Sequence, residues 1–442
     1  MIKSERSIVG KFGGTSMATS DSIIQSGKIV NSEKMRAVVV SAPGKKNLDD
    51  IKVTDSLLRC SQLVNKGEPF EDVFSMVIEK FENIGRDLEM HNDTIRWLEL
   101  THKGIASGFG RDWIASRGEN IMARIFSKYI DGFFYDAEDL IILNENRQVN
   151  NISYEIIKNK LEKQNIPYVI PGFYGKKFDG SILTFERGGS DITGAIIARG
   201  LEADEYQNWT DVDGVRAADP RLIHDAKSIH EMTFREMREM SYRGAGVLMM
   251  DAIIPVAEFE IPVIVKNTFN PSNDGTRIVA KRESNTEEII IGIASRDGFV
   301  SIQIGKNGMN SEKGIAGKIL ECFEENDVSV EHDPTGIDMM SVISHKDQLN
   351  GKTDKIINRI KEMVCPDEIN VINNIGLVCI VGQNISKKSS FILSKMSSHL
   401  LKKGIEISSI TYPTEGNSMI IGFNNNNIKE AVIAIYDALI RN

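Results

Sequence analysis

The chain has 442 residues, of which 41% are hydrophobic, and a formal net charge of −9 at pH 7. A chain of this length is expected to form two or three globular domains. The acidic balance argues against nucleic acid as the main partner, because binding a phosphate backbone needs clustered lysine and arginine, and without a long apolar run no membrane insertion is expected.

The first elements along the chain enclose a glycine-rich anchor, Lys-Phe-Gly-Gly-Thr-Ser, at residues 11–16. An apolar stretch that begins at Ile8 predicts a strand before it, and the pattern of residues 21–30 predicts a helix after it. Glycines allow backbone N–H groups to approach phosphate oxygens, and the helix N-terminus and Lys11 add positive charge. The anchor therefore suits phosphate binding, although it does not match the Gly-x-x-x-x-Gly-Lys motif. Taken alone, it is more often a lysine before an ordinary glycine turn.

Strand-like and helix-like segments then alternate up to about residue 280. We expect helices at residues 55–66 and 121–129, and strands at residues 37–41, 168–171 and 263–266. Continuous apolar strands between helices indicate a mostly parallel sheet that is covered on both faces. The first part of the chain is therefore expected to be an α/β domain.

A second glycine-rich anchor, Glu-Arg-Gly-Gly-Ser-Asp, occupies residues 186–191 and opens a helix expected at residues 191–198. Like the first anchor, it joins paired glycines to a cation and a hydroxyl. Two such anchors suit the binding of a nucleotide's phosphates while a second anion approaches. The alternative is that Ser190 or Asp191 only caps the helix.

The composition changes after residue 281, where a charged and polar stretch follows, and we place a domain boundary near residue 285. Beyond it, a strand leads to a helix, and a strand that ends in Pro-Thr leads to another strand; this order occurs twice. Such a duplication predicts two α+β modules. The expected helices are 314–325 and 389–403, and the expected strands are 328–332, 340–343, 406–410 and 419–422.

The cysteines and paired aspartates do not indicate a metal site. The cysteines show no Cys-x-x-Cys spacing, so we expect buried thiols in a reducing cytoplasm. Asp211 and Asp213 precede a glycine, but an EF-hand needs that glycine at loop position six and a distal glutamate. The four cysteines are Cys60, Cys322, Cys365 and Cys379.

Five ordered motifs together resemble aspartate kinase, and the resemblance extends over the whole chain. The segments 40–55 and 331–342 are most similar to the monofunctional, lysine-sensitive type. No dinucleotide fingerprint follows the modules, so no fused homoserine dehydrogenase is expected. The motifs are KFGGTS at 11–16, SRGEN at 116–120, ERGGSD at 186–191, WTDVDGV at 209–215 with Asp219-Pro220-Arg221, and KNTFNP at 266–271.

The resemblance implies a three-layer αβα sandwich of the amino-acid-kinase type at residues 1–284 and a regulatory region of two ferredoxin-like ACT modules at residues 285–442. The modules are expected at about 299–374 and about 375–442, with the strand 289–294 joining the second. The implied reaction is ATP-dependent phosphorylation of the L-aspartate side chain to 4-phospho-L-aspartate, the first step of lysine, threonine and methionine biosynthesis. Exposed strand edges in the modules favour a homodimer or a dimer of dimers.

The resemblance also implies the site residues. Lys11, Arg187 and Asp191 are the implied catalytic residues: Lys11 stabilises the transferring phosphoryl group, Arg187 grips the substrate α-carboxylate, and Asp191 orients Lys11 or a magnesium-bound water. Glu119 binds the substrate ammonium group, and Thr54 contacts the substrate. ATP, which carries Mg²⁺, is expected to contact Lys11, Gly13, Gly14, Ser16, Thr210, Asp211, Arg221, Gly246 and Val247.

Two of these residues have alternative interpretations. Glu119 is equally compatible with a first-turn glutamate that the helix dipole favours. Asp219-Pro220-Arg221 also suits a simple turn.

One segment departs from the family pattern, because many members have Gly-Ala-Lys-Val-Leu-His-Pro where residues 244–250 read Gly-Ala-Gly-Val-Leu-Met-Met. Gly246 thus replaces a lysine that contacts ATP elsewhere, and only main-chain contacts are expected there.

A feedback amino acid, expected to be lysine, is implied at an interface between modules of two chains. Glu331 and Asp338 suit a cationic side chain, and a turn at Gly336 exposes backbone groups to a carboxylate. The alternative is a solvated strand end. The implied contacts are Met309, Glu331, Thr335, Gly336, Ile337 and Asp338.

Two other functions stay open from the sequence. One is a catalytically impaired amino-acid sensor that keeps the ACT modules, and the other is a related kinase that acts on glutamate, carbamate or a nucleoside monophosphate. The retention of Lys11, Glu119, Arg187 and Asp191 favours the aspartate kinase.

Overall fold

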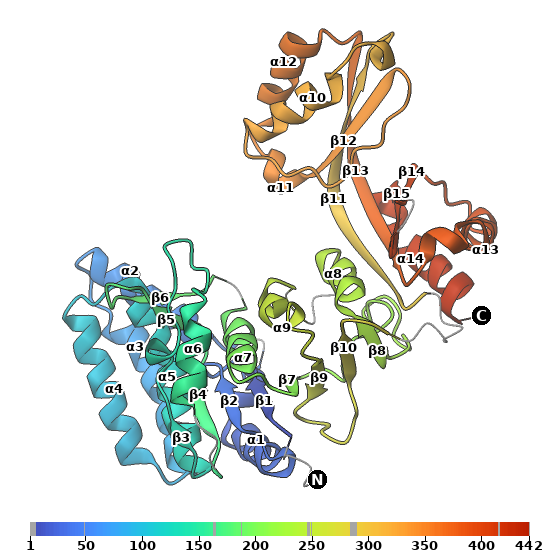
Figure 1. Ribbon diagram of the computed structural model, residues 1–442. Coiled ribbons are helices and arrows are strands. Elements are labelled where there is room, and N and C mark those ends of the chain that lie inside the picture. Colours follow the sequence, from blue (N-terminus) through green and yellow to red (C-terminus); the bar gives the residue numbers. More distant parts are fainter. Residues whose placement is uncertain are drawn as a thin grey trace. The chain divides into compact units, whose positions relative to one another are not determined.

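A computed structural model of the chain describes two compact units (Figure 1). The first comprises Met1–Val215, Ser228–Phe234 and Val247–Glu283, and the second comprises Arg216–Lys227, Arg235–Gly246 and Ser284–Asn442. The expected boundary near residue 285 lies outside the described residues. No helix in the described part is long and apolar enough to cross a membrane. The described residues are 6–47, 49–161, 165–186, 188–244, 248, 250–282, 290–413 and 416–441.

An eight-stranded sheet forms the centre of the first unit, with the strand order β3-β4-β2-β1-β7-β9-β10-β8. All neighbouring strands are parallel except β9 and β10, which confirms the expected mostly parallel sheet. A separate hairpin joins β5 and β6. The bounds are β1 (Ile8–Phe12), β2 (Ala37–Val40), β3 (Phe133–Phe134), β4 (Tyr168–Pro171), β5 (Tyr174–Lys176), β6 (Ile182–Thr184), β7 (Glu205–Thr210), β8 (Glu231–Thr233), β9 (Val263–Asn267) and β10 (Thr276–Val279).

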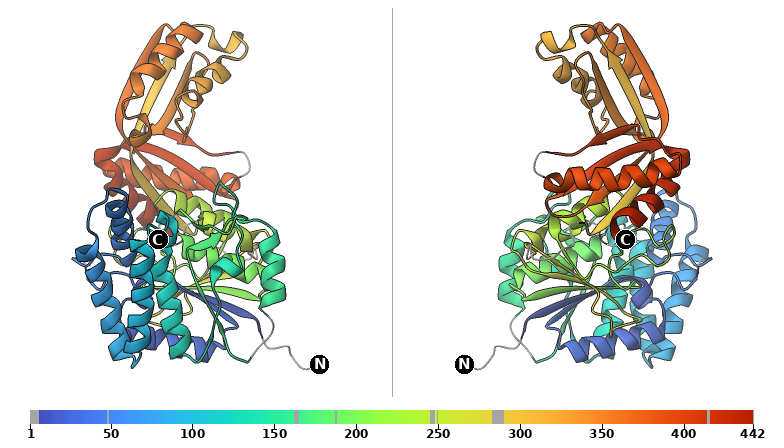
Figure 2. Two further views of the ribbon diagram at one scale, coloured as in Figure 1. Left: turned by 90° about the vertical axis from the view of Figure 1, so that its left-hand side faces the viewer. Right: turned by 90° about the vertical axis from the view of Figure 1, so that its right-hand side faces the viewer.

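Helices cover both faces of this sheet and complete three layers (Figure 2). On one face α1 and α5 contact the strands, and α2, α3 and α4 pack outside them; on the other, α7 contacts β1, β2 and β7, with α6 and α9 beside it. The strands β1, β2 and β4 are wholly buried, which explains their continuous apolar runs. The helices are α1 (Ser20–Glu33), α2 (Val53–Asn65), α3 (Glu71–Asp87), α4 (His91–Ala106), α5 (Arg111–Tyr129), α6 (Ile152–Lys160), α7 (Gly189–Gly200) and α9 (Ile254–Ala257). The helix α8 (Phe234–Tyr242) belongs, except for its first residue, to the second unit.

The helix predictions for this unit were incomplete. The helix expected at residues 121–129 is the last half of α5, which begins at Arg111. The sequence analysis did not identify α3 and α4, which pack against each other and against α2 and α5. The predicted helix at residues 55–66 matches α2 with a start two residues earlier.

The second unit contains a five-stranded sheet with the order β12-β11-β13-β15-β14, in which every neighbouring pair is antiparallel. The long strands β11 and β13 pair along most of their length, β12 pairs with residues 299–305 of β11, and β15 pairs with residues 375–381 of β13. The two modules therefore share one continuous sheet. The bounds are β11 (Gly292–Gly305), α10 (Ile315–Glu324), β12 (Met339–His345), α11 (Lys346–Leu349), α12 (Thr353–Val364), β13 (Glu368–Val381), α13 (Ser389–Lys402), β14 (Ser409–Thr411), β15 (Ser418–Asn424) and α14 (Ile428–Tyr436).

Two predictions for the second unit were wrong. Residues 328–332 do not form a strand; His332 makes an isolated bridge to Ile343, and the alternating Val328 and Val330 pack on the apolar core of the first module instead. Cys365 is exposed, whereas the other three cysteines are buried as expected. Cys365 occupies the left-handed C-cap of α12, with φ of 47°, and the end of a helix lies at the surface.

Candidate functional site

Lys11 lies near the end of β1 and forms a buried polar cluster with residues of two neighbouring elements. Its Nζ lies 2.6 Å from Oδ1 of Asp191 and donates a 3.5 Å hydrogen bond to Oδ1 of Asn208. Asn208 Nδ2 in turn donates to Oδ1 of Asp191 over 2.9 Å. The parallel register of β1 and β7 pairs Lys11 directly with Asn208, and only 7% of Lys11 is exposed. A positive charge is thus held in place where these strands end.

Asp191 belongs to the first turn of α7, but its side chain does not cap that helix. The N-cap is Gly188, with φ of 66°, and no side chain caps the helix. The Asp191 carboxylate instead binds Lys11 and Asn208. A second-anchor aspartate that pairs with a first-anchor lysine favours the functional interpretation over simple capping.

The glycines after β1 lie against the backbone of the segment after β2. The N–H of Gly13 donates to the carbonyl of Trp209, and the N–H of Gly44 donates to the carbonyl of Gly14 over 2.8 Å. A Cβ atom at Gly44 would lie 2.6 Å from the carbonyl carbon of Gly14, and one at Gly13 would lie 3.4 Å from Lys11 Nζ. The backbone thus approaches the Lys11 amine closely, which fits a phosphate cradle.

Ser16, the last residue of the first anchor, is fully buried in the short helical turn Thr15–Met17. Its hydroxyl forms a 2.7 Å hydrogen bond with Oγ1 of Thr268, the residue after β9. The hydroxyl of Ser16 thus links the turn after β1 to the end of β9. The expected contact of Ser16 with ATP stays a prediction.

Glu119 lies in the third turn of α5, so the interpretation as a first-turn glutamate was wrong. Only 5% of the residue is exposed, its carboxylate accepts the N–H of Ala42, and its Oε2 has no hydrogen-bond partner among the described residues. Burial raises the pKa of Glu119 to about 8, although the Ala42 N–H opposes this shift. A buried carboxylate oxygen without a partner indicates a place for a hydrogen-bond donor.

The start of α2 lies beside this part of α5. A Cβ atom at Gly118 would lie 2.9 Å from Cβ of Ala42 and 3.0 Å from Cγ1 of Val53, so only glycine allows this approach. Thr54, which follows Val53, is half-buried in the first turn of α2. The two substrate residues expected from the sequence, Thr54 and Glu119, therefore lie on adjacent helices.

Thr210 is the last residue of β7, Asp211 follows it, and both border the same edge of the sheet as Lys11. The hydroxyl of Thr210 donates to Asp211, whose side chain is exposed, and the carbonyl of Thr210 accepts the N–H of Thr268. In open parallel sheets, ligands bind outside the carboxyl ends of the strands. This placement is compatible with the expected nucleotide contacts.

The placement of four expected site residues relative to this cluster stays untested. Arg221 belongs to the second unit, where its Nε donates to Oδ1 and its Nη2 to Oδ2 of Asp219 in a turn, as the alternative interpretation expected. Arg187, Gly246 and Val247 lie outside the described residues.

The sequence analysis missed Asn208 and Gly44. Asn208 lies one residue before the WTDVDGV motif, and nothing in its local pattern distinguishes it from other polar residues of a strand. Gly44 follows Pro43 directly after a predicted strand, which is a turn signal that could have been read.

The residues expected to bind an effector lie in the first module of the second unit. Glu331 accepts a hydrogen bond from the hydroxyl of Tyr242, and its Oε2 is buried without a partner among the described residues. Asp338 accepts the N–H of Gly308, which places the turn that contains Met309 beside it. Met309 itself is buried in the module core. The hairpin residues Thr335, Gly336, Ile337 and Asp338 are exposed.

Metal ligands are not clustered in the described part of the chain, where no group of three or more His, Cys, Asp or Glu is arranged to hold an ion.

Comparison with known proteins identifies relatives over the whole chain. The sequence profile of the amino acid kinase family matches residues 6–267. Aspartokinase 3 of Bacillus subtilis is 35% identical, over 97% of this chain and 97% of its own length. The chloroplastic aspartokinase 3 of Arabidopsis thaliana is 26% identical, over 97% of this chain and 81% of its own length.

Solved structures give the same result. The aspartate kinase of Clostridium acetobutylicum superimposes with a TM-score of 0.92 at 39% identity, covering 98% of this chain and 100% of that structure. Aspartokinase III of E. coli, solved in complex with lysine and aspartate, superimposes with a TM-score of 0.75 at 24% identity, covering 98% and 99% of the two chains. The likeness to the E. coli protein is one of fold.

Proposed function

The chain belongs to the aspartate kinases of the amino acid kinase family, and we propose that the residues around Lys11 transfer the γ-phosphoryl group of MgATP to the side-chain carboxylate of L-aspartate. The product is 4-phospho-L-aspartate, from which lysine, threonine and methionine are made. The observation that carries this assignment is the buried ion pair of Lys11 and Asp191 beside the glycines of the first anchor.

The chemistry of this reaction requires positive charge rather than a base. The side-chain carboxyl group of aspartate has a reference pKa of about 3.9, so it is already ionised at neutral pH. Its approach to the phosphate is opposed, because two unit charges at about 4 Å repel by about 4 kcal/mol at an effective dielectric constant near 20. Catalysis must therefore come from cations and backbone donors that face both anions.

Lys11 supplies the cation. It is held by Asp191 and Asn208, so its Nζ keeps one position while charge moves onto the phosphoryl oxygens. The backbone at Gly13 and Gly14 provides the close approach that phosphates need. Asp191 positions Lys11, and it is also the carboxylate that would contact a water on the magnesium ion of the nucleotide; Mg²⁺ bound there neutralises phosphate charge.

Glu119 accounts for recognition of the amino acid. Its partnerless Oε2 is buried, and an ammonium group is a donor that would satisfy it and favour its charged form. Thr54 on the adjacent helix contacts the substrate in this proposal, and Arg187 grips the α-carboxylate. Thr210, Asp211, Arg221, Gly246 and Val247 complete the nucleotide contacts.

Feedback control by lysine is the second part of the proposal. Glu331, whose Oε2 is buried without a described partner, and Asp338 supply negative charge for a cationic side chain, and the exposed hairpin at Gly336 offers backbone groups. The strands β12 and β14 form the edges of the second unit's sheet, and exposed Ile337 lies next to β12. These features support a homodimer, or a dimer of dimers, that pairs through the ACT modules. Our proposal places this enzyme in the cytoplasm.

The experiment that tests the activity is trapping of the acyl phosphate. Purified protein is incubated with MgATP, hydroxylamine and either L-aspartate or L-glutamate, and the hydroxamate is measured. We expect the aspartyl hydroxamate. A glutamyl hydroxamate alone would identify a kinase with another substrate, and no hydroxamate together with lysine binding would identify an amino-acid sensor.

A further inference from the structure

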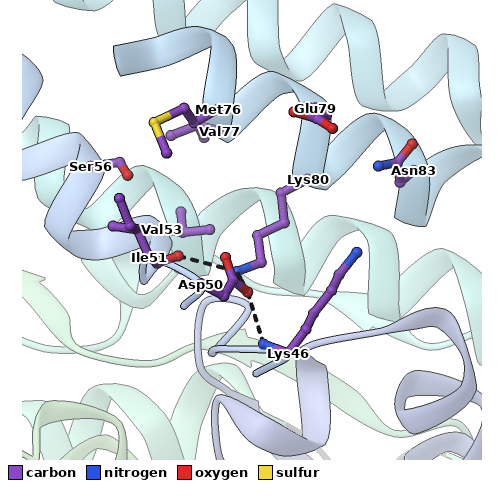
Figure 3. Close-up of a pocket in the computed structure, with 10 residues that line it drawn as sticks. All are labelled: Lys46, Asp50, Ile51, Val53, Ser56, Met76, Val77, Glu79, Lys80 and Asn83. Atoms are coloured by element: carbon purple, nitrogen blue, oxygen red, sulfur yellow. Dashed lines mark hydrogen bonds and ion pairs between the residues drawn. The ribbon is translucent and has the colours of Figure 1, made fainter. Parts of the chain in front are cut away.

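Lys80 is a nearly buried lysine outside the cluster around Lys11. It lies on α3 between the core residues Val77 and Phe81, and only 8% of it is exposed. Burial of an ammonium group is costly unless it is paired. Figure 3 shows how the pairing is met: Nζ donates to Oδ2 of Asp50 over 2.7 Å and to the carbonyl of Ile51 over 3.2 Å.

Both partners of Lys80 belong to the segment that joins β2 to α2, residues 41–52, which we call the β2–α2 loop. Oδ2 of Asp50 also accepts the N–H of Lys46 over 2.8 Å, so the carboxylate closes the second half of the loop on itself. Burial would raise the pKa of Asp50, but the hydrogen bonds from Lys80 and from the Lys46 N–H outweigh it and lower that pKa. The Asp50 carboxylate is therefore ionised at neutral pH.

The first half of the same loop borders the proposed active site. The N–H of Ala42 donates to Glu119, and the N–H of Gly44 donates to the carbonyl of Gly14. The loop ends where α2 begins, one residue before Thr54. A single loop thus contacts the phosphate cradle and the buried carboxylate at one end, and carries the substrate threonine just beyond its other end.

Among the described residues in the second half of the loop, 47 and 49–52, little apolar surface is buried. Ile51 is 46% exposed and Lys52 is exposed as well. The loop lines a small polar crevice of about 170 Å³ together with α2 and α3, so it is not packed tightly against these helices (Figure 3). Segments with few apolar contacts open easily unless polar contacts retain them. In this loop Lys80 makes such a polar contact from α3.

We propose that Lys80 is a positioning residue for the aspartate site, an inference that rests on the proposed function. Through Asp50 and Ile51 it holds the end of the β2–α2 loop and so the first turn of α2, which presents Thr54. The contact of Gly44 with Gly14 is made by backbone atoms at the other end of the loop. Loss of Lys80 should therefore weaken aspartate binding much more than ATP binding.

The test compares four variants of the full chain by steady-state kinetics, with aspartate and ATP varied in turn. For Lys80→Met and Asp50→Asn we expect the KM for aspartate to rise about tenfold while the KM for ATP changes by less than about twofold. Both substitutions break the contact between Lys80 and Asp50. The double variant should therefore resemble Lys80→Met rather than multiply the effects of the two single variants. Lys80→Arg, which keeps the charge and the donors, should restore most of the affinity.

The matched control is Lys158→Met on α6, which breaks an exposed 2.6 Å ion pair with Glu202 in the same unit. Lys158→Met should leave the KM values for aspartate and for ATP unchanged. A general loss of stability in any variant should also leave both KM values of its folded fraction unchanged. An unchanged aspartate KM in both Lys80→Met and Asp50→Asn, or an equal rise for both substrates, would overturn the proposal. If Lys80→Met does not fold, Asp50→Asn and Lys80→Arg decide the result.

Failure of the proposed function gives a different result. In that case the wild-type protein forms no aspartyl hydroxamate. Aspartate binding to the wild type and to Lys80→Met is then compared by calorimetry, since the positioning of Thr54 affects binding without turnover. Wild-type binding that Lys80→Met weakens supports the role of Lys80, and no aspartate binding by the wild type overturns it.

Discussion

Nζ of Lys11 lies 2.6 Å from Oδ1 of Asp191, so an ion pair joins the end of β1 to the first turn of α7. The two side chains are 9% and 17% exposed. Their shared partner Asn208 lies on β7. Because the pair is mostly removed from water, its geometry is held more firmly than that of a surface ion pair. The lysine is thus oriented before any phosphate binds, which is the condition for electrostatic catalysis.

The first prediction concerns Lys11 itself. Lys11→Met should lower kcat by about 10³-fold or more, because the charge that faces the transferring phosphoryl group is lost. The fold and lysine binding should persist, as measured by circular dichroism and calorimetry. The exposed Lys158→Met variant provides the comparison. Unfolding of Lys11→Met would instead favour a purely structural lysine, and near-normal turnover would contradict its catalytic role.

Some strands of the first unit could be predicted, because wholly buried parallel strands appear as continuous apolar runs, as at residues 37–40 and 168–171. The strands β3, β5, β6, β7, β8 and β10 were not predicted. The pairing of Lys11 with Asp191 followed from family resemblance, since nothing local joins residues so distant in sequence. Asn208 could not be predicted, because its role depends on the register of β1 against β7. The position of Glu119 in the third turn of α5 was also not predicted, because no side-chain cap marks the start of this helix.

The second prediction concerns the contact of two loops at Gly44. Gly44→Ala should raise the KM for ATP about tenfold, since the new methyl group would lie 2.6 Å from the carbonyl carbon of Gly14 and displace the phosphate cradle. The backbone of Gly44 is not left-handed, so the effect is one of space. Gly317→Ala on α10 is the control, because a Cβ atom there meets no atom within 4 Å. An unchanged KM for ATP would contradict the proposal that the backbone at Gly13 and Gly14 binds the phosphates of ATP.

The third prediction concerns the effector site. Glu331→Gln should raise the lysine concentration for half-inhibition about tenfold while kcat without lysine stays the same, since a charged partner of the lysine ammonium group is lost. The measurement is a lysine titration of hydroxamate formation. The control is Glu325→Gln on the same module, where the carboxylate pairs with Arg359 at the surface. Equal sensitivity to lysine in Glu331→Gln and the wild type would remove Glu331 from the site.

The fourth prediction is a pH dependence of aspartate capture. The pKa of Glu119 is raised to about 8, so below that pH most of the free enzyme carries a neutral carboxyl group that binds an ammonium ion poorly. The kcat/KM for aspartate should rise about tenfold per pH unit from about pH 6 and level off above about pH 8. The kcat should vary less, because bound substrate keeps Glu119 ionised. Glu119→Gln should lower kcat/KM and flatten the profile.

The same group makes a separate prediction for stability. The pKa of Glu119 rises from 4.5 to about 8 on folding, so between these values the folded state holds a proton that the unfolded state has released. Its contribution to stability is complete below about pH 4.5 and is lost as the pH rises toward about 8. Glu119→Gln cannot lose a proton, so its melting temperature relative to the wild type should increase across this range. A constant difference would show that Glu119 is ionised throughout, and would remove the basis for the kinetic profile.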